Sequence, residues 1–210
     1  MRSRLLVLME FKMPPSSHPL PPENFNQINL PISLVPGRNY YRLNNSSFNS
    51  AIYFDKSGRG RFDGSAQSYG ICYVGENLEA AFIECFGRDL GVRFLSQEFI
   101  RTRNLFEIKS ERALTLVDLF GSGLTKLGMD SRVTGGGNYI LSRIWAEAIY
   151  NHPERVDGIR YYSRHDNTQL CCGLFDRTSD SLTQTNRGNL IDKHVEKLAK
   201  ILDFYQFGLG

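Results

Sequence analysis

Residues 58–87 show three successive patterns of apolar and polar positions. Residues 58–64 form a polar stretch with three glycines and two arginines, which is typical of a loop. Residues 69–74 are a short run of aromatic and β-branched residues, which predicts a buried strand. From Asn77 onward apolar residues recur at helical spacing, so Asn77 is predicted to cap a helix. Glu84 lies about 130° from the centre of the apolar stripe of this helix, so it faces either water or a cleft.

Elsewhere the chain shows more short strand patterns than helical ones. Strands are expected at 39–43, 51–54, 104–108, 114–120, 158–163 and 169–175. Helices are expected at 138–150, with a stripe that includes Ile140 and Ile144, and after Asn189, where apolar residues recur as far as Tyr205. Residues 126–134 are predicted to be irregular and 178–188 to be a polar loop. Strands and helices in this order favour an α+β fold.

Seven of the eight prolines lie between residues 13 and 37, which predicts an extended arm. The domain organisation expected from these patterns is a proline-rich arm at 1–36, one domain at 37–180, and at 181–210 a C-terminal amphipathic helix packed on that domain. The apolar run near the N-terminus is too short for a signal peptide, although a start at Met9 or Met13 stays open.

Composition narrows the class of protein further. A chain of 210 residues with 41% hydrophobic residues is long enough to form a real core. No run has the length of a membrane span, so we expect a cytoplasmic protein that does not bind membranes. The four cysteines lie in apolar runs and are expected to be reduced core residues. The histidines are scattered, and we expect no metal site. A net charge of +3 suits an anionic ligand but is weak support for nucleic-acid binding.

Several residues are candidates for chemistry, and each has an ordinary alternative. Arg59 and Arg61 in the glycine-containing loop suit a phosphate group, as do many surface arginines. Arg42 lies within a predicted strand, where it needs an anionic partner or an edge position from which its head reaches solvent. Ser163 ends a predicted strand and is typical of a turn. Neither a Rossmann fingerprint nor a phosphate-binding P-loop is present.

Taken together, these segments resemble the RES-domain family, which is named for an arginine, a glutamate and a serine. The resemblance covers roughly residues 35–177 and is carried, in the order of the family, by segments 41–43, 60–63, 69–74, 80–84, 116–119, 139–145, 157–166 and 174–177. The proline-rich arm and the last helix lie outside it.

The resemblance implies a fold like that of the ADP-ribosyltransferase toxins, a split antiparallel β core with flanking helices. It implies bacterial enzymes that destroy NAD⁺ as a substrate, with no separate cofactor, and that are often toxins restrained by a DNA-binding antitoxin. Residue by residue, it assigns the family arginine to Arg42, the glutamate to Glu84 and the serine to Ser163. It also implies that Arg61 is a second arginine that contacts NAD⁺ and that Tyr73 lines the nicotinamide side.

The implied reaction is cleavage of the nicotinamide–ribose bond by phosphorolysis, with inorganic phosphate as co-substrate, or by hydrolysis. Two alternatives stay open: ADP-ribosyl transfer onto a protein, and a non-enzymatic basic module that binds nucleic acid. The expected partners are NAD⁺ and a separate antitoxin protein, with no direct contact to nucleic acid. The sequence also leaves a homodimer open.

Overall fold

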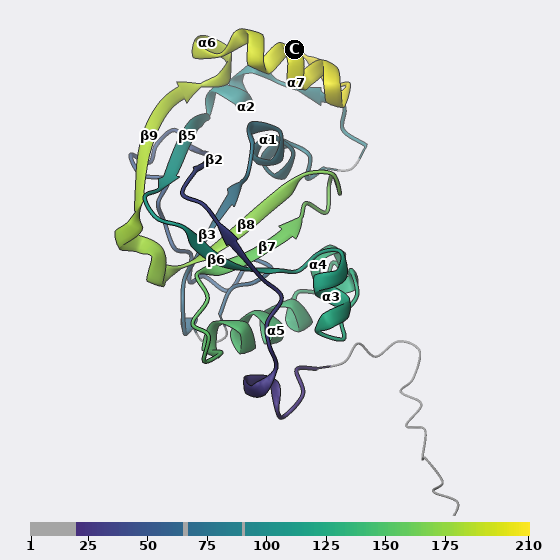
Figure 1. The fold of residues 1–210 in the computed structure, drawn as a ribbon. Coiled ribbons are helices and arrows are strands. Elements are labelled where there is room, and N and C mark those ends of the chain that lie inside the picture. The colour runs from purple at the N-terminus through teal and green to yellow at the C-terminus, as the bar shows by residue number, and fades with distance from the viewer. Residues whose placement is uncertain (1–19, 65–66, 90) are drawn as a thin grey trace, which may run out of the picture.

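The computed structural model describes residues 20–64, 67–89 and 91–210 of the chain, so most of the predicted proline-rich arm lies outside the described residues. The fold is a strongly curved sheet with helices packed on it (Figure 1). The strands are β1 (Ile32–Val35), β2 (Asn39–Asn45), β3 (Ile71–Gly75), β4 (Phe94–Leu95), β5 (Arg103–Ser110), β6 (Leu114–Asp118), β7 (Gly158–Tyr162), β8 (Leu170–Phe175), β9 (Leu182–Asn189) and β10 (Gly208–Leu209). The α-helices are α1 (Leu78–Phe86), α2 (Gln97–Arg101), α3 (Ser122–Lys126), α4 (Arg132–Gly135), α5 (Ile140–Asn151), α6 (Leu190–Lys193) and α7 (Val195–Tyr205). Short 3₁₀ helices include η1 (Phe25–Gln27) and η3 (Asp176–Ser181).

Eight strands form the main sheet in the order β1-β6-β7-β8-β3-β2-β5-β9. Neighbouring strands are antiparallel except β6 and β7, which run parallel. β4 and β10 form a separate two-stranded parallel pair. Helices and a largely antiparallel sheet make this an α+β fold, as the sequence predicts.

The sheet divides between its two central strands. β2 and β3 share a single residue pair, Tyr41 with Gly75, whereas β2 pairs with β5 along its whole length. Past that pair, the segment before β3 takes the free edge of β3, and Asp55 exchanges two backbone hydrogen bonds with Ile71, of 2.8 and 3.1 Å. The antiparallel core is therefore split, and the opening lies between β2 and β3.

Helices cover the two halves of the split sheet separately. α1 lies inside the curve of the sheet, with α2, α6 and α7 on the β5 side and α5 with α3 and α4 on the β6–β7 side (Figure 1). Phe82 and Phe86 of α1 pack in one apolar cluster with Leu198 and Ile201 of α7. Trp145 of α5 belongs to a second cluster, which includes residues of β3, β6 and β7. The three buried cysteines, Cys72, Cys171 and Cys172, are free, as expected of core residues. None of the helices in the described part of the chain has the length and apolarity of a membrane span.

The prediction of a strand at 51–54 is wrong, because side chains satisfy the backbone of this segment in place of a neighbouring strand. Gln184 Oε1 accepts from the amides of Ala51 (2.7 Å) and Ile52 (3.1 Å). Arg42 Nη1 donates to the carbonyls of Ala51 (3.0 Å) and Tyr53 (3.3 Å).

The prediction of a polar loop at 178–188 is also wrong, since this range holds the end of η3 and most of β9. β9 pairs with β5 at the edge of the sheet and is mostly exposed, so its Thr, Gln and Asn side chains lack the apolar alternation that marks a strand. β1, within the range expected to be the arm, pairs with β6 at the opposite edge. Both flanking ranges thus add a strand to the sheet, and the boundaries 37–180 stay a prediction.

Three further predictions need correction. Residues 126–134 are not wholly irregular, because they include the end of α3 and most of α4. The helix that Asn189 caps is short, and the chain leaves helical geometry at His194 (φ −141°, ψ 41°) before α7 begins. On α5, Ile140 and Ile144 are exposed, because the helix turns Ser142 inward, where its hydroxyl donates to the carbonyl of Val133.

Candidate active site

A cavity of about 660 Å³ lies at the opening between β2 and β3. Its walls come from β2, β3, α1, the loop before β3, and the turn between β7 and β8. The volume falls within the range of about 300–1,000 Å³ that is common for small-molecule sites. Four of the five predicted site residues line it: Arg42, Arg61, Tyr73 and Glu84.

Glu84 faces this cavity rather than bulk water, which decides the alternative that the helical pattern left open. It is half-buried at the end of the second turn of α1, and its Oε1 accepts a 2.6 Å hydrogen bond from the hydroxyl of Ser163. Ser163 is only 1% exposed, and its hydroxyl oxygen also accepts from the amide of His165 (3.1 Å). These contacts place Ser163 behind Glu84, where it fixes the orientation of the carboxylate.

The helix that carries Glu84 is anchored at its first turn. The side chain of Asn77 accepts from the amide of Ala80 (2.7 Å), as predicted for an N-cap, and donates to Gln169 Oε1 (2.8 Å). Gln169 lies just before β8, next to the turn that holds Ser163. Glu84 and Ser163 are therefore positioned by two elements that are themselves tied together.

The loop at 58–64 is folded around the buried carboxylate of Asp63. Asp63 accepts from the amide of Gly60 (2.7 Å) and from the hydroxyl of Tyr73 (2.8 Å), which in turn accepts from the amide of Phe62 (2.9 Å). A Cβ at Gly60 would lie 2.6 Å from that hydroxyl, so only glycine fits. The backbone amides of Gly60 and Phe62 are thus already hydrogen-bonded to Asp63 and Tyr73. The loop can therefore bind an anion through its arginine side chains. Burial raises the pKa of Tyr73, so this hydroxyl stays protonated.

Arg61 is carried by this loop and is 8% exposed. Its Nη1 donates to the carbonyl of Gly136 (2.7 Å), and its guanidinium lies 4.6 Å from the ring centroid of Tyr139. Burial lowers the pKa of Arg61 below its usual range, because the charged guanidinium is largely removed from water. A largely desolvated cation with few competing partners favours contact with an anionic ligand.

Arg42 projects from β2 into the opening of the sheet. Besides the carbonyls of Ala51 and Tyr53, its Nη1 lies 3.1 Å from Cys72 Sγ. Among the described residues, all of its hydrogen bonds come from Nη1, so the other guanidinium donors remain for a ligand in the cavity. Arg42 thus holds the segment at 51–53 through its Nη1 and directs its remaining donors to the cavity.

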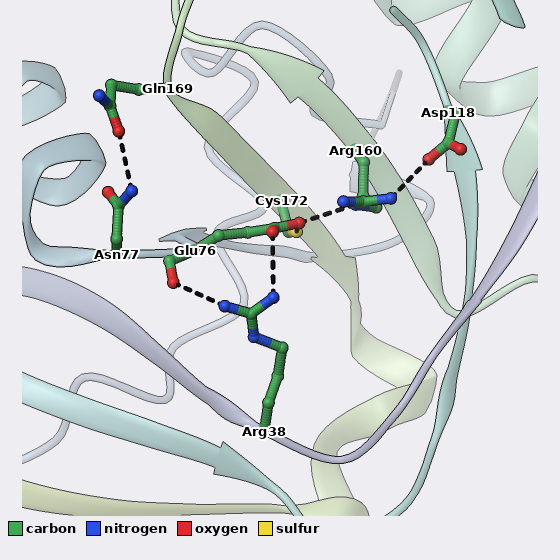
Figure 2. A network of polar contacts seen from close by, with 7 residues as sticks. All are labelled: Arg38, Glu76, Asn77, Asp118, Arg160, Gln169 and Cys172. Carbon is green, nitrogen blue, oxygen red and sulfur yellow. Dashed lines mark hydrogen bonds and ion pairs between the residues drawn. The ribbon is translucent and has the colours of Figure 1, made fainter.

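A separate network of ion pairs lies at the junction of β3 and α1 (Figure 2). Glu76 receives Arg160 Nε at 2.7 Å and Arg38 Nη1 at 3.2 Å, and Arg160 also contacts Asp118 Oδ1 at 3.2 Å. The side chains of Glu76 and Arg160 are only 10% and 15% exposed, so these charges depend on one another. The network ties β2, β6 and β7 to the residue that precedes the cap of α1.

Glu76→Gln is expected to lower the free energy of unfolding by about 1.5–3 kcal/mol, because it removes the charge that pairs with Arg160 at a site where Arg160 is only 15% exposed and keeps Asp118 as a charged partner. Urea denaturation measures this loss. Glu111→Gln is the matched control, since Glu111 pairs with Lys109 on the exposed surface and should cost much less. Equal losses in the two variants would refute the structural role of the network.

Sequence reasoning found five cavity residues, the four above and Arg59, and missed others that lie beside them. Arg88 and Arg103 line the cavity, as do Tyr139, Arg164 and His165 from the turns that follow. Arg88 follows Glu84 by four residues on the helical path, a spacing that could have indicated it. Arg103 gave no such signal, because only the pairing of β5 with β2 brings it to the cavity. Within the described residues, no three His, Cys, Asp or Glu side chains are grouped as metal ligands.

The fold and the site agree with the comparison with known families. The family model described as the RES domain matches residues 35–192, about three quarters of the chain, and the chain belongs to this family.

Two particular relatives extend this result. The chain is 31% identical to a protein of Sinorhizobium fredii (strain NBRC 101917 / NGR234) named "Probable toxin y4kH". The matching region of 96 residues covers 46% of this chain and 74% of that protein. The fold resembles a chain in the crystal structure of the M. tuberculosis MbcT–MbcA toxin–antitoxin complex, with a TM-score of 0.59 and 11% identity over 83% of this chain and 90% of that chain. At that identity the second likeness concerns the fold alone.

Proposed function

We propose that this protein consumes NAD⁺ by cleaving the bond between nicotinamide and ribose. The observation that supports the proposal most directly is the carboxylate of Glu84, held by Ser163 in a cavity that Arg42 and Arg61 also line. Membership of the RES-domain family supports the same chemistry.

The chemistry needs only one carboxylate because of the leaving group. Ordinary glycoside hydrolysis uses two carboxyl groups, one of which protonates the departing oxygen. In NAD⁺ the ring nitrogen already bears positive charge. When the bond from ribose to this nitrogen breaks, the electron pair neutralises the ring, and nicotinamide departs without a proton.

Each site residue then has a role. Glu84 stabilises the positive charge that develops on the ribose, and Ser163 keeps the carboxylate in place. Arg42 and Arg61 bind the diphosphate and fix the reacting geometry. The ring of Tyr73 forms part of the nicotinamide wall, while its hydroxyl holds the arginine loop. The attacking oxygen comes from water or from inorganic phosphate and forms a new bond to the same ribose carbon.

We further propose that the protein is the toxin of a toxin–antitoxin pair and is restrained by a separate protein. The names of the two relatives support this proposal. Growth of cells that express the protein tests it: wild type should arrest growth, and Glu84→Gln should not. Arrest by both variants would contradict a toxicity based on this site.

Product analysis tests the reaction itself. Purified protein is incubated with NAD⁺, with and without inorganic phosphate, and the products are identified by mass spectrometry. We expect nicotinamide together with ADP-ribose, or with its phosphate ester when phosphate is the acceptor. An ADP-ribosylated protein would instead favour transfer onto a protein, and intact NAD⁺ would contradict the proposed function.

A further inference from the structure

The cavity carries more positive charge than a diphosphate requires. Six arginines and two carboxylates line it, a formal surplus of four positive charges. The arginines are Arg42, Arg59, Arg61, Arg88, Arg103 and Arg164, and the carboxylates are Asp55 and Glu84. Burial lowers the pKa of His165, which also lines the cavity, so it adds no charge near neutral pH.

No carboxylate among the described residues forms an ion pair with any of these six arginines. The contrast with the network in Figure 2 is direct, because there Arg38 and Arg160 are paired with Glu76 and Asp118. Within the described part of the chain, Arg38 and Arg160 are therefore neutralised by carboxylates, whereas the six arginines of the cavity are not. Such an excess of one charge attracts a ligand of the opposite charge.

Two of the uncompensated arginines form a second group, away from the loop that carries Arg61. Arg88 lies just after Gly87, which caps the end of α1, and Arg103 begins β5 opposite Asn45 of β2. Both line the cavity together with Cys85. Burial raises the pKa of the Cys85 thiol, and the nearby charges of Arg103 and Arg88 oppose this shift. Arg88 Nε donates to the carbonyl of Glu84 (2.9 Å), and Arg103 Nη1 donates to the carbonyl (3.2 Å) and the hydroxyl (3.1 Å) of Thr102.

We propose that Arg88 and Arg103 form an additional phosphate subsite, so that the cavity accepts a dinucleotide that carries a third phosphate on its adenosine ribose. This inference rests on the proposed function. A diphosphate carries about two negative charges, the nicotinamide ring carries one positive charge, and a phosphomonoester adds roughly 1.5 to 2 negative charges at pH 7. A dinucleotide with a third phosphate therefore balances more of the surplus of four positive charges than NAD⁺ does. Arginine is the side chain best suited to bind such a group with two parallel hydrogen bonds.

The test compares NADP⁺ with NAD⁺ as substrates of the full-length protein. Wild type is expected to consume both, and Arg88→Gln and Arg103→Gln are each expected to lower the ratio of kcat/KM for NADP⁺ to that for NAD⁺ by about tenfold. Arg101→Gln is the matched control, because Arg101 makes its ion pair with Asp192 outside the cavity, and it should leave the ratio unchanged.

The outcomes separate this inference from the proposed function. Consumption of NAD⁺ without consumption of NADP⁺ overturns the third-phosphate subsite and leaves the proposed function intact. Both dinucleotides could be consumed while neither variant changes the ratio of kcat/KM for NADP⁺ to that for NAD⁺. This result would show that other residues bind the third phosphate, and it would overturn the role of Arg88 and Arg103. Failure to consume either dinucleotide contradicts the proposed function itself.

Discussion

Glu84→Gln is expected to slow NAD⁺ turnover by about 10²–10³-fold, because the variant keeps the shape of the side chain and removes the charge that stabilises the ribose in the transition state. NAD⁺ binding should change little, since the amide still fits beside Ser163. Steady-state kinetics measure kcat, and calorimetric titration measures binding.

The matched control for this variant lies on the same helix. Glu79→Gln also removes one carboxylate from α1, but Glu79 lies in the first turn and does not line the cavity. It should turn over NAD⁺ at nearly the rate of wild type. A Glu84→Gln variant that keeps full activity would show that this carboxylate does not stabilise the transition state.

Arg42→Ala is expected to raise KM for NAD⁺ by roughly 10–100-fold, the usual loss when a charge-assisted hydrogen bond is removed. The same change removes the donor to the carbonyls of Ala51 and Tyr53, so the protein should also become less stable. Initial rates over a range of NAD⁺ concentrations, together with a melting curve, separate the two effects.

Gln184→Ala is the control that makes the Arg42 result interpretable. Gln184 holds the same segment through the amides of Ala51 and Ile52 but lies outside the cavity. This variant should lose stability while KM stays close to that of wild type. If KM rises equally in both variants, the effect of Arg42 comes from the loosened segment rather than from contact with the substrate.

The local parts of the site were predictable because they depend on residues close together in the chain. Helical spacing and the N-cap at Asn77 indicated α1, and the same spacing placed Glu84 off its apolar face. The resemblance to the RES-domain family then selected Arg42 and Ser163, which local pattern alone could not distinguish from an edge arginine and a turn serine.

The long-range parts were not predictable, because they depend on which strands pair. The split between β2 and β3 arises where side chains of Arg42 and Gln184 replace a neighbouring strand, and no local pattern encodes that replacement. β9 escaped prediction because an exposed edge strand needs no apolar alternation. Arg103 reaches the cavity only through the pairing of β5 with β2.

The role of Ser163 changed most between sequence and structure. The sequence pattern is typical of a turn and the resemblance makes it the family serine, whereas its burial and its hydrogen bond to Glu84 make it a residue that orients the carboxylate. A turn next to a strand end and a buried partner of the acid are compatible, because the β7–β8 connection passes directly beside α1.

The most direct test of the central claim is the release of free nicotinamide from NAD⁺, followed over time by proton NMR with the purified wild-type protein. The account predicts many molecules of nicotinamide released per molecule of protein. NAD⁺ that stays intact in the presence of correctly folded wild-type protein, with and without inorganic phosphate, would contradict it.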